Sequence, residues 1–275
     1  MSFIFAQALT GLAGAASLFL IAAGLSLIFG VTRIVNFAHG SFTMLGAYMA
    51  VSLSGALMPL AGPIGFWLAV PLAALGAGTL GAVMEIAILR HLYRSNELYP
   101  LLATFAVLLI LQDAALGLWG PEDLLGPLAP GLTGAVTVFG ARVPSYDLFL
   151  IAMGPITLGL LLLLLHRTRW GLLLRAAAQD REMAGALGVD QRRLFTAVVF
   201  LGTALAGLGG ALQMPREAAN LGMDLNVIVE AFVVVVIGGM GSLTGAFLAA
   251  ILIGVLSAFG IVLFPQITLV LLFLV

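Results

Sequence analysis

The feature that most constrains this chain is a succession of long apolar runs separated by short polar connections. A helix needs about 20 apolar residues to cross the hydrocarbon core of a bilayer, and the strict alternation of a membrane β-strand is missing here. The runs therefore predict an all-α, polytopic transmembrane helical bundle of about 8–9 membrane segments. We place them at residues 3–30, 41–58, 64–89, 99–119, 147–165, 194–214, 225–240 and 243–264, with a further run from about residue 266.

The composition supports lipid as the solvent of this chain. Hydrophobic residues make up 62% of the sequence and charged residues 8%, too little charge to cover a water-soluble domain of this size. The net charge of −1 gives no electrostatic support for binding nucleic acid. Cysteine is absent, and the three histidines lack metal-ligand spacing. We therefore expect no metal and no cofactor bound by this chain, and the lipid bilayer as a partner.

The positions of the arginines predict the orientation. All eleven basic residues are arginine, and they concentrate in the connections 90–98 and 166–193. Because positive residues favour the cytoplasmic side, both connections are predicted to be cytoplasmic and the N-terminus to be outside. Residues 120–146 contain prolines, glycines and acids but one arginine, which favours an external loop. We expect a single transmembrane domain over residues 1–275, and, because the last run is uncapped, a natural chain that continues.

A polar cluster interrupts the first two apolar runs. The sequence VTRIVNFAHGS, residues 31–41, contains Arg33, Asn36 and His39 at spacings of three, which would place them on one face of a helix. The flanking glycines favour a broken or re-entrant element, which lipid tolerates only where protein or a water-filled cavity covers it. The alternative is a cytoplasmic turn with Arg33 at the lipid headgroups.

Two acids lie within apolar runs. Asp113 follows LLILQ, and Glu230 precedes AFVVVV. A carboxylate at the centre of a bilayer costs about 3 kcal/mol, so by default it faces the protein interior or a wet cavity. The alternative is a position near an interface, because Asp113 is six residues from Trp119 and Glu230 could cap the outer end of its run.

The predicted cytoplasmic segment 169–194 contains an amphipathic helix. Strong helix formers run up to Gly188, a natural helix end. Met183 and Leu187 lie one turn apart on a side that otherwise carries alanines. Mixed charges on the other side disfavour binding to anionic lipid, so we favour a helix that docks into the groove of a partner. The charged residues are Arg175, Asp180, Arg181 and Glu182.

An enzyme is the less favoured reading of the polar residues. His39 and Ser41 are close in sequence and Ser242 follows glycines, as an intramembrane hydrolase would need. However, neither a nucleophile elbow nor a third orienting group is evident. The GxGxxG match at residues 76–81 lies within an apolar run, where close helix packing explains it.

Three stretches carry a resemblance to a known family. They are GLSLIFGVTRIVNFAHGSFTMLGAY (24–48), LLRAAAQDREMAGALGVDQRRL (173–194) and AFVVVVIGGMGSLTGAFLAAILIG (231–254). In these stretches the chain resembles the integral-membrane permeases of bacterial branched-chain amino-acid ABC importers, specifically the first of the two paired permeases. The likeness extends over nearly the whole chain.

The resemblance implies a transport subunit of the bacterial inner membrane that works by alternating access. Its partners would be a second permease, cytoplasmic ATP-binding subunits and an external solute-binding protein. The chain has no Walker A sequence, so ATP hydrolysis would belong to the partner subunits. The helix 173–190 would couple to the ATPase through Arg175, Ala176, Asp180, Arg181, Glu182, Met183, Leu187 and Gly188. We expect the translocation pathway at Asn36, Phe37, His39, Gly40, Asp113 and Glu230, where the two acids come from our own reading of the residues.

Two further function classes stay open. An ion-coupled secondary transporter would act alone, with Asp113 or Glu230 as the coupling carboxylate, although inverted repeats are not apparent. A passive channel or scaffold would tolerate disruption of the 169–194 helix.

Overall fold

The computed structural model describes residues 2–93, 95, 96, 98–138 and 140–263, and nearly all of its regular structure is helical. A two-stranded antiparallel sheet pairs β1 with β2, with Ala135 opposite Pro144. The elements in chain order are α1 (Ser2–Thr32), α2 (His39–Ala61), α3 (Pro63–Met84), the π-helix η1 (Glu85–Leu89), α4 (Arg90–Leu92), α5 (Leu98–Trp119), β1 (Ala135–Val138), β2 (Ala141–Pro144), α6 (Ser145–Arg167), α7 (Arg169–Gln179), α8 (Arg181–Ala186), α9 (Gln191–Gln213), α10 (Met223–Gly238) and α11 (Leu243–Leu263).

The apolar runs predict the long helices to within a few residues. Within the described part of the chain, seven helical segments are long and apolar enough to cross a membrane. The eighth, α10, has 16 residues and so measures about 24 Å, shorter than the roughly 30 Å hydrocarbon core. The helical bundle predicted from the sequence is confirmed, and the run expected from residue 266 lies outside the described residues.

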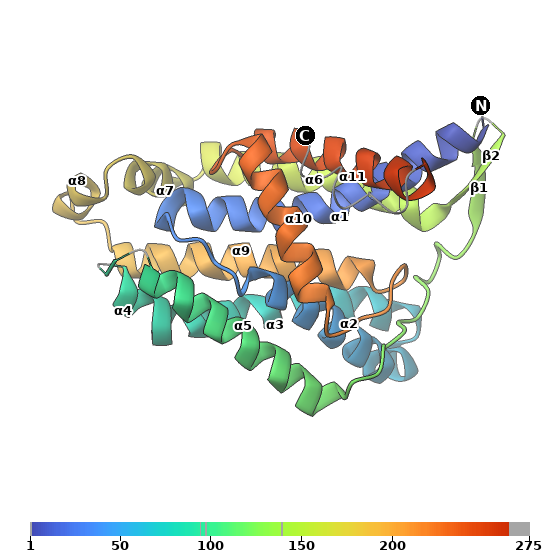
Figure 1. The fold of residues 1–275 in the computed structure, drawn as a ribbon, viewed down its shortest axis with the longest axis horizontal. Helices are drawn as coiled ribbons and strands as arrows, with labels where there is room; N and C mark the ends of the chain where they lie inside the picture. Colours follow the sequence, from blue (N-terminus) through green and yellow to red (C-terminus); the bar gives the residue numbers. More distant parts are fainter. Residues whose placement is uncertain (1, 94, 97, 139, 264–275) are drawn as a thin grey trace.

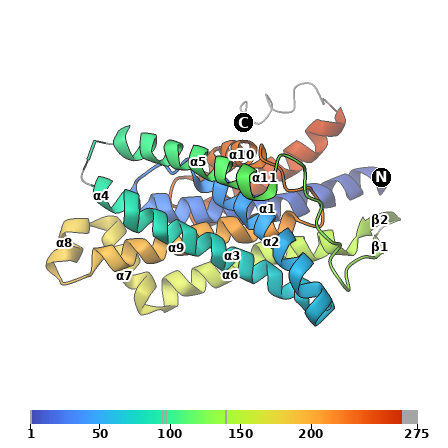
Figure 2. The same ribbon diagram turned by 90° about the horizontal axis from the view of Figure 1, so that it is seen from below.

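The long helices lie side by side along the longest axis of the molecule, with α1 in the middle of the bundle (Figures 1 and 2). Helix α1 packs against α6, α9 and α11. The short α10 crosses the long helices steeply, and in both views it covers little of the bundle's length.

Small residues let the helix backbones approach closely, as membrane helices require in the absence of a hydrophobic driving force. A Cβ atom added to Gly202 of α9 would lie 2.7 Å from the carbonyl oxygen of Gly24 of α1. On the other side of α9, a Cβ at Gly78 of α3 would lie 3.0 Å from the carbonyl oxygen of Phe200. Glycine is therefore required where α9 contacts its neighbours.

The two ends of the bundle differ in chemistry. The arginine-rich end holds α4, α7, α8 and the first turn of α9, whereas the opposite end, the hairpin end, holds the N-terminus and the β1–β2 hairpin (Figure 1). The sequence predicts residues 120–146 as an external loop and does not predict this hairpin. Its register brings Val136 opposite Val143, a cross-strand pair that only the folded chain defines.

Candidate functional site

The connection between α1 and α2 is a break in the helical structure, as predicted. Helix α1 ends at Thr32, whose hydroxyl accepts a hydrogen bond from the Ile34 N–H at 3.2 Å. Arg33 has a φ of +56°, a left-handed backbone conformation that takes the chain out of the helix. Because residues 33–38 are not helical, the prediction that Arg33, Asn36 and His39 share one helical face is wrong. Arg33 is exposed, whereas Asn36 and His39 are fully buried.

The buried polar groups that follow this break are incompletely satisfied. His39 Nε2 lies 2.9 Å from the Ile21 carbonyl oxygen of α1, but Nδ1 has no protein partner. Neither the nitrogen nor the oxygen of the Asn36 amide has one. An unsatisfied buried polar group costs about 1–3 kcal/mol, which makes this region a candidate for contact with a polar ligand. Phe37, between them, is half-buried and contacts the rings of Phe105 and Phe232.

Gly40 brings the start of α2 against α10. A Cβ atom at this position would collide with the backbone carbonyl of Asp224, so only glycine permits the contact. Next to it, the Ser41 hydroxyl donates to Asp224 Oδ2 at 3.4 Å, and Asp224 is fully buried. The sequence reading missed Asp224 because it lies one residue before the predicted run. Its position between Met223 and an apolar stretch was the available signal.

The two acids assigned to the pathway occupy different environments. Glu230 is half-buried and lines a cavity of about 350 Å³ between α1, α10, α11 and the α9–α10 connection. Glu217, Asn226 and Arg216 line the same cavity. Asp113 is exposed on α5. The structure thus places Glu230 at a cavity and does not bring Asp113 together with the buried Asn36 and His39.

The predicted coupling helix is two helices, not one. Asp180 separates α7 from α8, with an extended backbone (φ −142°, ψ 101°), and its side chain accepts a hydrogen bond from the Met183 N–H at 2.9 Å. Aspartate competes with the helix for backbone donors in this way, so it begins a new helix instead of continuing the old one. The prediction of a single rigid helix over 173–190 is therefore wrong.

The predicted helix end and apolar surface agree with the structure. Gly188 has a φ of +85°, and Val189 N–H donates to the Ala184 carbonyl at 3.1 Å, which closes a glycine-dependent helix end. Met183 and Leu187 are 57% and 78% exposed, so α8 and its C-cap residue Leu187 present two large apolar side chains to the outside. Ala176, Asp180 and Glu182 are also exposed, whereas Arg175 and Arg181 are half-buried.

Arg181 points inward from the first residue of α8. Its Nη2 donates to the carbonyl oxygens of Val31 at 2.8 Å and Thr32 at 3.1 Å, the last two residues of α1. Its guanidinium carbon lies 4.7 Å from the centroid of the Phe195 ring of α9. The sequence predicts Arg181 on the polar side of a single helix and does not predict this contact with α1.

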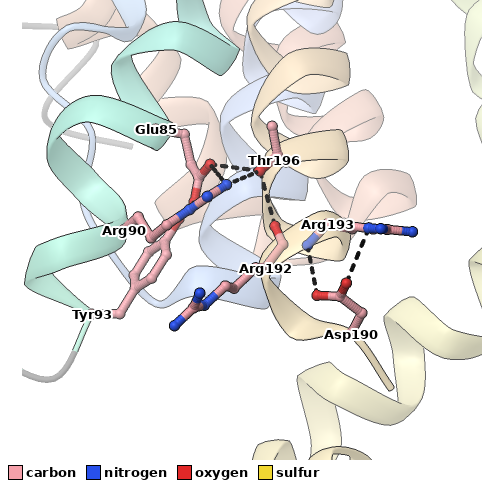
Figure 3. A network of polar contacts seen from close by, with 7 residues as sticks. All are labelled: Glu85, Arg90, Tyr93, Asp190, Arg192, Arg193 and Thr196. Carbon is pink, nitrogen blue, oxygen red and sulfur yellow. Dashed lines mark hydrogen bonds and ion pairs between the residues drawn. The ribbon is translucent and has the colours of Figure 1, made fainter. Parts of the chain in front are cut away.

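A polar network that the sequence reading missed joins the end of α3 to α9 (Figure 3). The fully buried Glu85 accepts hydrogen bonds from Thr196 at 2.6 Å, Arg90 at 3.1 Å and Tyr93 at 3.3 Å. Burial, and next the negative charge of Glu85, raise the pKa of Tyr93, so its phenol stays protonated and donates. An acid within an apolar run, five residues before an arginine, was the available signal.

In the described part of the chain, no three His, Asp or Glu side chains group in a way that could hold a metal ion.

Comparisons with known proteins agree on one family. Residues 7–275 match the family model for the permease component of the branched-chain amino acid transport system. The chain is 29% identical over 262 residues to the high-affinity branched-chain amino acid transport system permease protein BraD of Pseudomonas aeruginosa, covering 92% of this chain and 85% of that protein.

Two further relatives have similar identity to this chain. The probable branched-chain amino acid transport permease protein LivH of Methanocaldococcus jannaschii is 32% identical over 255 residues, which cover 86% of this chain and 75% of that protein. The permease protein LivM of Escherichia coli is 27% identical over 255 residues, which cover 84% of this chain and 58% of that protein. No solved structure matches the chain.

Proposed function

Because this chain belongs to the family of permease components of the branched-chain amino acid transport system, we propose that it forms half of the translocation pathway of an ATP-driven importer for branched-chain or related amino acids. As a permease it is a non-enzymatic subunit, and ATP hydrolysis takes place in partner subunits. The similarity to both the LivH and the LivM permease proteins supports pairing with a second, related permease.

The distribution of arginines supports an orientation with the arginine-rich end in the cytoplasm. In a bacterial inner membrane, the N-terminus and the β1–β2 hairpin at the opposite end would then face the outside, where a solute-binding protein delivers the substrate (Figure 1). The arginines at the arginine-rich end include Arg90, Arg167, Arg169, Arg175, Arg181, Arg192 and Arg193.

Helix α8 is the docking element for the ATPase in this proposal, and its exposed apolar pair is the observation that carries it. Met183 and Leu187 lie one helical turn apart, and each is more than half exposed. Two such side chains on a short helix beyond the membrane helices fit the apolar groove of a partner protein. The surrounding exposed charges, Asp180 and Glu182, form a polar rim.

The translocation pathway is proposed to pass the start of α2, where Asn36, Phe37, His39 and Gly40 lie beside α10. The unpartnered amide of Asn36 and the free Nδ1 of His39 offer hydrogen-bonding groups to a substrate that crosses without its water shell. Glu230 and its cavity of about 350 Å³ would form the entrance from the hairpin end.

Asp113 would line this pathway if the exposed face of α5 packs against the second permease. A carboxylate directed at acyl chains would cost about 3 kcal/mol, which a wet or protein-covered surface avoids. We therefore place the partner permease on the face of α5 that carries Asp113.

The proposal is tested by co-expressing this chain with the second permease, the ATP-binding subunits and the solute-binding protein encoded beside it. We expect the ATP-binding subunits to co-purify with the wild-type chain and to be lost from the Met183→Glu/Leu187→Glu variant. A matched control is Leu125→Glu/Leu128→Glu, since these leucines are 81% and 65% exposed in the loop at the hairpin end. The control should retain the ATPase.

Transport assays in liposomes separate this proposal from the alternatives. ATP-dependent uptake of branched-chain amino acids by the assembled complex, abolished by the α8 variant, supports the importer. Uptake by the chain alone, lost on Glu230→Gln or Asp113→Asn, would instead establish an ion-coupled secondary transporter. ATP-independent uptake that survives all of these changes would establish a passive channel.

A further inference from the structure

The guanidinium of Arg181 closes the C-terminal end of α1. The last carbonyl groups of a helix have no partner within the helix and carry partial negative charge, so a cation is stabilised there. Arg181 Nη2 donates to the Val31 and Thr32 carbonyls, at 2.8 and 3.1 Å. Both bonds are charge-assisted and connect segments about 150 residues apart in the chain.

Contacts on the other sides hold Arg181 in this position. Its guanidinium lies over the ring of Phe195, where a cation is attracted to the π-electrons. The side chain of Gln191 donates to the backbone carbonyl of Arg181, which ties the start of α8 to the first turn of α9. Burial lowers the pKa of Arg181, yet an arginine is protonated at any physiological pH.

The contact made by Arg181 leads directly to the break before α2. Thr32 is the last residue of α1, and Arg33, with its left-handed backbone, is the first residue of the break. Six residues separate α1 from α2, and among them lies the buried Asn36. A displacement of the Thr32 carbonyl therefore acts on the segment that places Asn36 and His39.

The space around Arg181 allows such a displacement. Arg181 and Tyr93 line two cavities, of about 590 Å³ and about 990 Å³. The first also borders residues 31–35, and the second borders the start of α9. Asp180 has an extended backbone conformation and separates α8 from α7. The short α8 is therefore not rigidly continuous with α7.

We propose that Arg181 is the positioning residue that transmits movement of α8 to the end of α1 and to the 33–38 break. The inference rests on the proposed docking of an ATPase at α8, and it assigns different tasks to residues two positions apart. Met183 faces outward to the partner, whereas Arg181 faces inward to α1. In this inference Arg181 takes part in the coupling from the inner side of α8, and Met183 makes the contact with the ATPase.

The test uses the assembled transporter with Arg181→Gln, Arg181→Lys and the control Arg192→Gln. Arg192 lies at the same end of the molecule, is exposed, and lies in the first turn of α9. We measure co-purification of the ATP-binding subunits, ATP hydrolysis, and uptake per ATP hydrolysed in proteoliposomes.

For Arg181→Gln we expect the ATP-binding subunits to remain bound and uptake per ATP to fall about tenfold, because two charge-assisted hydrogen bonds are lost. Arg181→Lys keeps the charge but not the planar, multi-donor geometry, so an intermediate loss is expected. The control, Arg192→Gln, should give the same uptake per ATP hydrolysed as the wild type.

A labelling measurement follows the break itself. The chain contains no cysteine, so Ile34→Cys introduces a single thiol into the break, on the wall of the cavity that Arg181 also lines. We expect its maleimide labelling rate to change when ATP is added to the complex, and this change to disappear with Arg181→Gln.

The outcomes distinguish the inference from the proposed function on which it rests. Wild-type uptake per ATP and ATP-sensitive labelling in Arg181→Gln would overturn the inference alone. Loss of the ATP-binding subunits from Arg181→Gln would also overturn it, because Arg181 would then be a docking contact. Absence of these subunits from the wild-type complex would refute the proposed function. If Arg181→Gln does not accumulate, two milder variants replace it: Arg181→Lys, and Phe195→Leu, which removes the ring under the guanidinium. A normal ratio of uptake to ATP hydrolysis in both would overturn the inference, and a lowered ratio would support it.

Discussion

The Thr196 hydroxyl of α9 donates a hydrogen bond of 2.6 Å to Glu85 Oε2 in the π-helix after α3, so a fully buried carboxylate joins two helices about 110 residues apart in the chain. Arg90 completes the charge balance, with Nη2 at 3.1 Å from the same oxygen. A buried carboxylate of this kind is stable only while its partners are in place.

Glu85→Ala should therefore destabilise the protein by about 3 kcal/mol, since it leaves Arg90 without its counter-ion in a largely buried position. Thermal unfolding of the purified chain in detergent, followed by tryptophan fluorescence, measures this loss. Arg193→Ala serves as the control, because it breaks an exposed ion pair with Asp190 worth at most about 1 kcal/mol and leaves the capping bond from the Arg193 N–H to Asp190 in place. Equal effects of the two substitutions would contradict the structural role of Glu85.

The raised pKa of Tyr93 predicts how stability depends on alkaline pH. Above about pH 10 a tyrosine ionises in the unfolded chain, whereas Tyr93 stays protonated in the folded chain because of burial and the charge of Glu85. The folded state then binds more protons than the unfolded state, so stability falls as the pH rises. Between pH 9 and 11 the wild type should lose stability more steeply than Tyr93→Phe. Parallel unfolding curves for the two proteins would show that Tyr93 is not buried beside Glu85.

Gly40→Ala should disrupt the contact between α2 and α10. The added methyl group collides with the Asp224 carbonyl, and such overpacking costs about 1–3 kcal/mol. Gly55→Ala, in the same helix, meets no atom within 4 Å and should stabilise the protein by about 0.5–1 kcal/mol. Comparing the two melting temperatures separates steric conflict from helix propensity, and a stable Gly40→Ala variant would place α10 elsewhere.

Asn36→Ala and His39→Ala should each lower transport about tenfold in the assembled complex, because each removes a hydrogen-bonding group offered to the substrate. ATPase binding should not change, since α8 is untouched. Thr79→Ala is the control, because this exposed hydroxyl donates to the Gly76 carbonyl within its own helix. Undiminished uptake by both variants would remove the start of α2 from the pathway.

The sequence predicts the long helices well because their apolar runs are local and their length is set by the bilayer. It also predicts the break before α2 and the helix end at Gly188, where glycine, polar residues and spacing act locally. The contact of Arg181 with α1 could not be predicted, because it depends on how residues 31 and 181 meet after folding. The hydrogen bonds of Glu85 and the burial of Asp224 likewise arise from packing between distant segments.

Asp180 shows how a local signal can be present and still be outweighed in a sequence reading. The alanines before it favour a helix, and in a propensity argument they dominate. In the structure, its carboxylate accepts a hydrogen bond from the Met183 N–H, and the helix restarts there. A capping residue thus decided the local structure against the surrounding propensity.

The short, steeply crossing α10 has a consequence for the energetics of permeation. Its length of about 24 Å is less than the thickness of the acyl layer, and little of that length lies along the bundle. Helix α10 therefore cannot span this layer by itself, and at least one of its ends, with the unpaired backbone N–H or C=O groups of a helix terminus, lies at the depth of the acyl chains. A zwitterion that moves past this end would exchange part of its hydration for hydrogen bonds to those backbone groups.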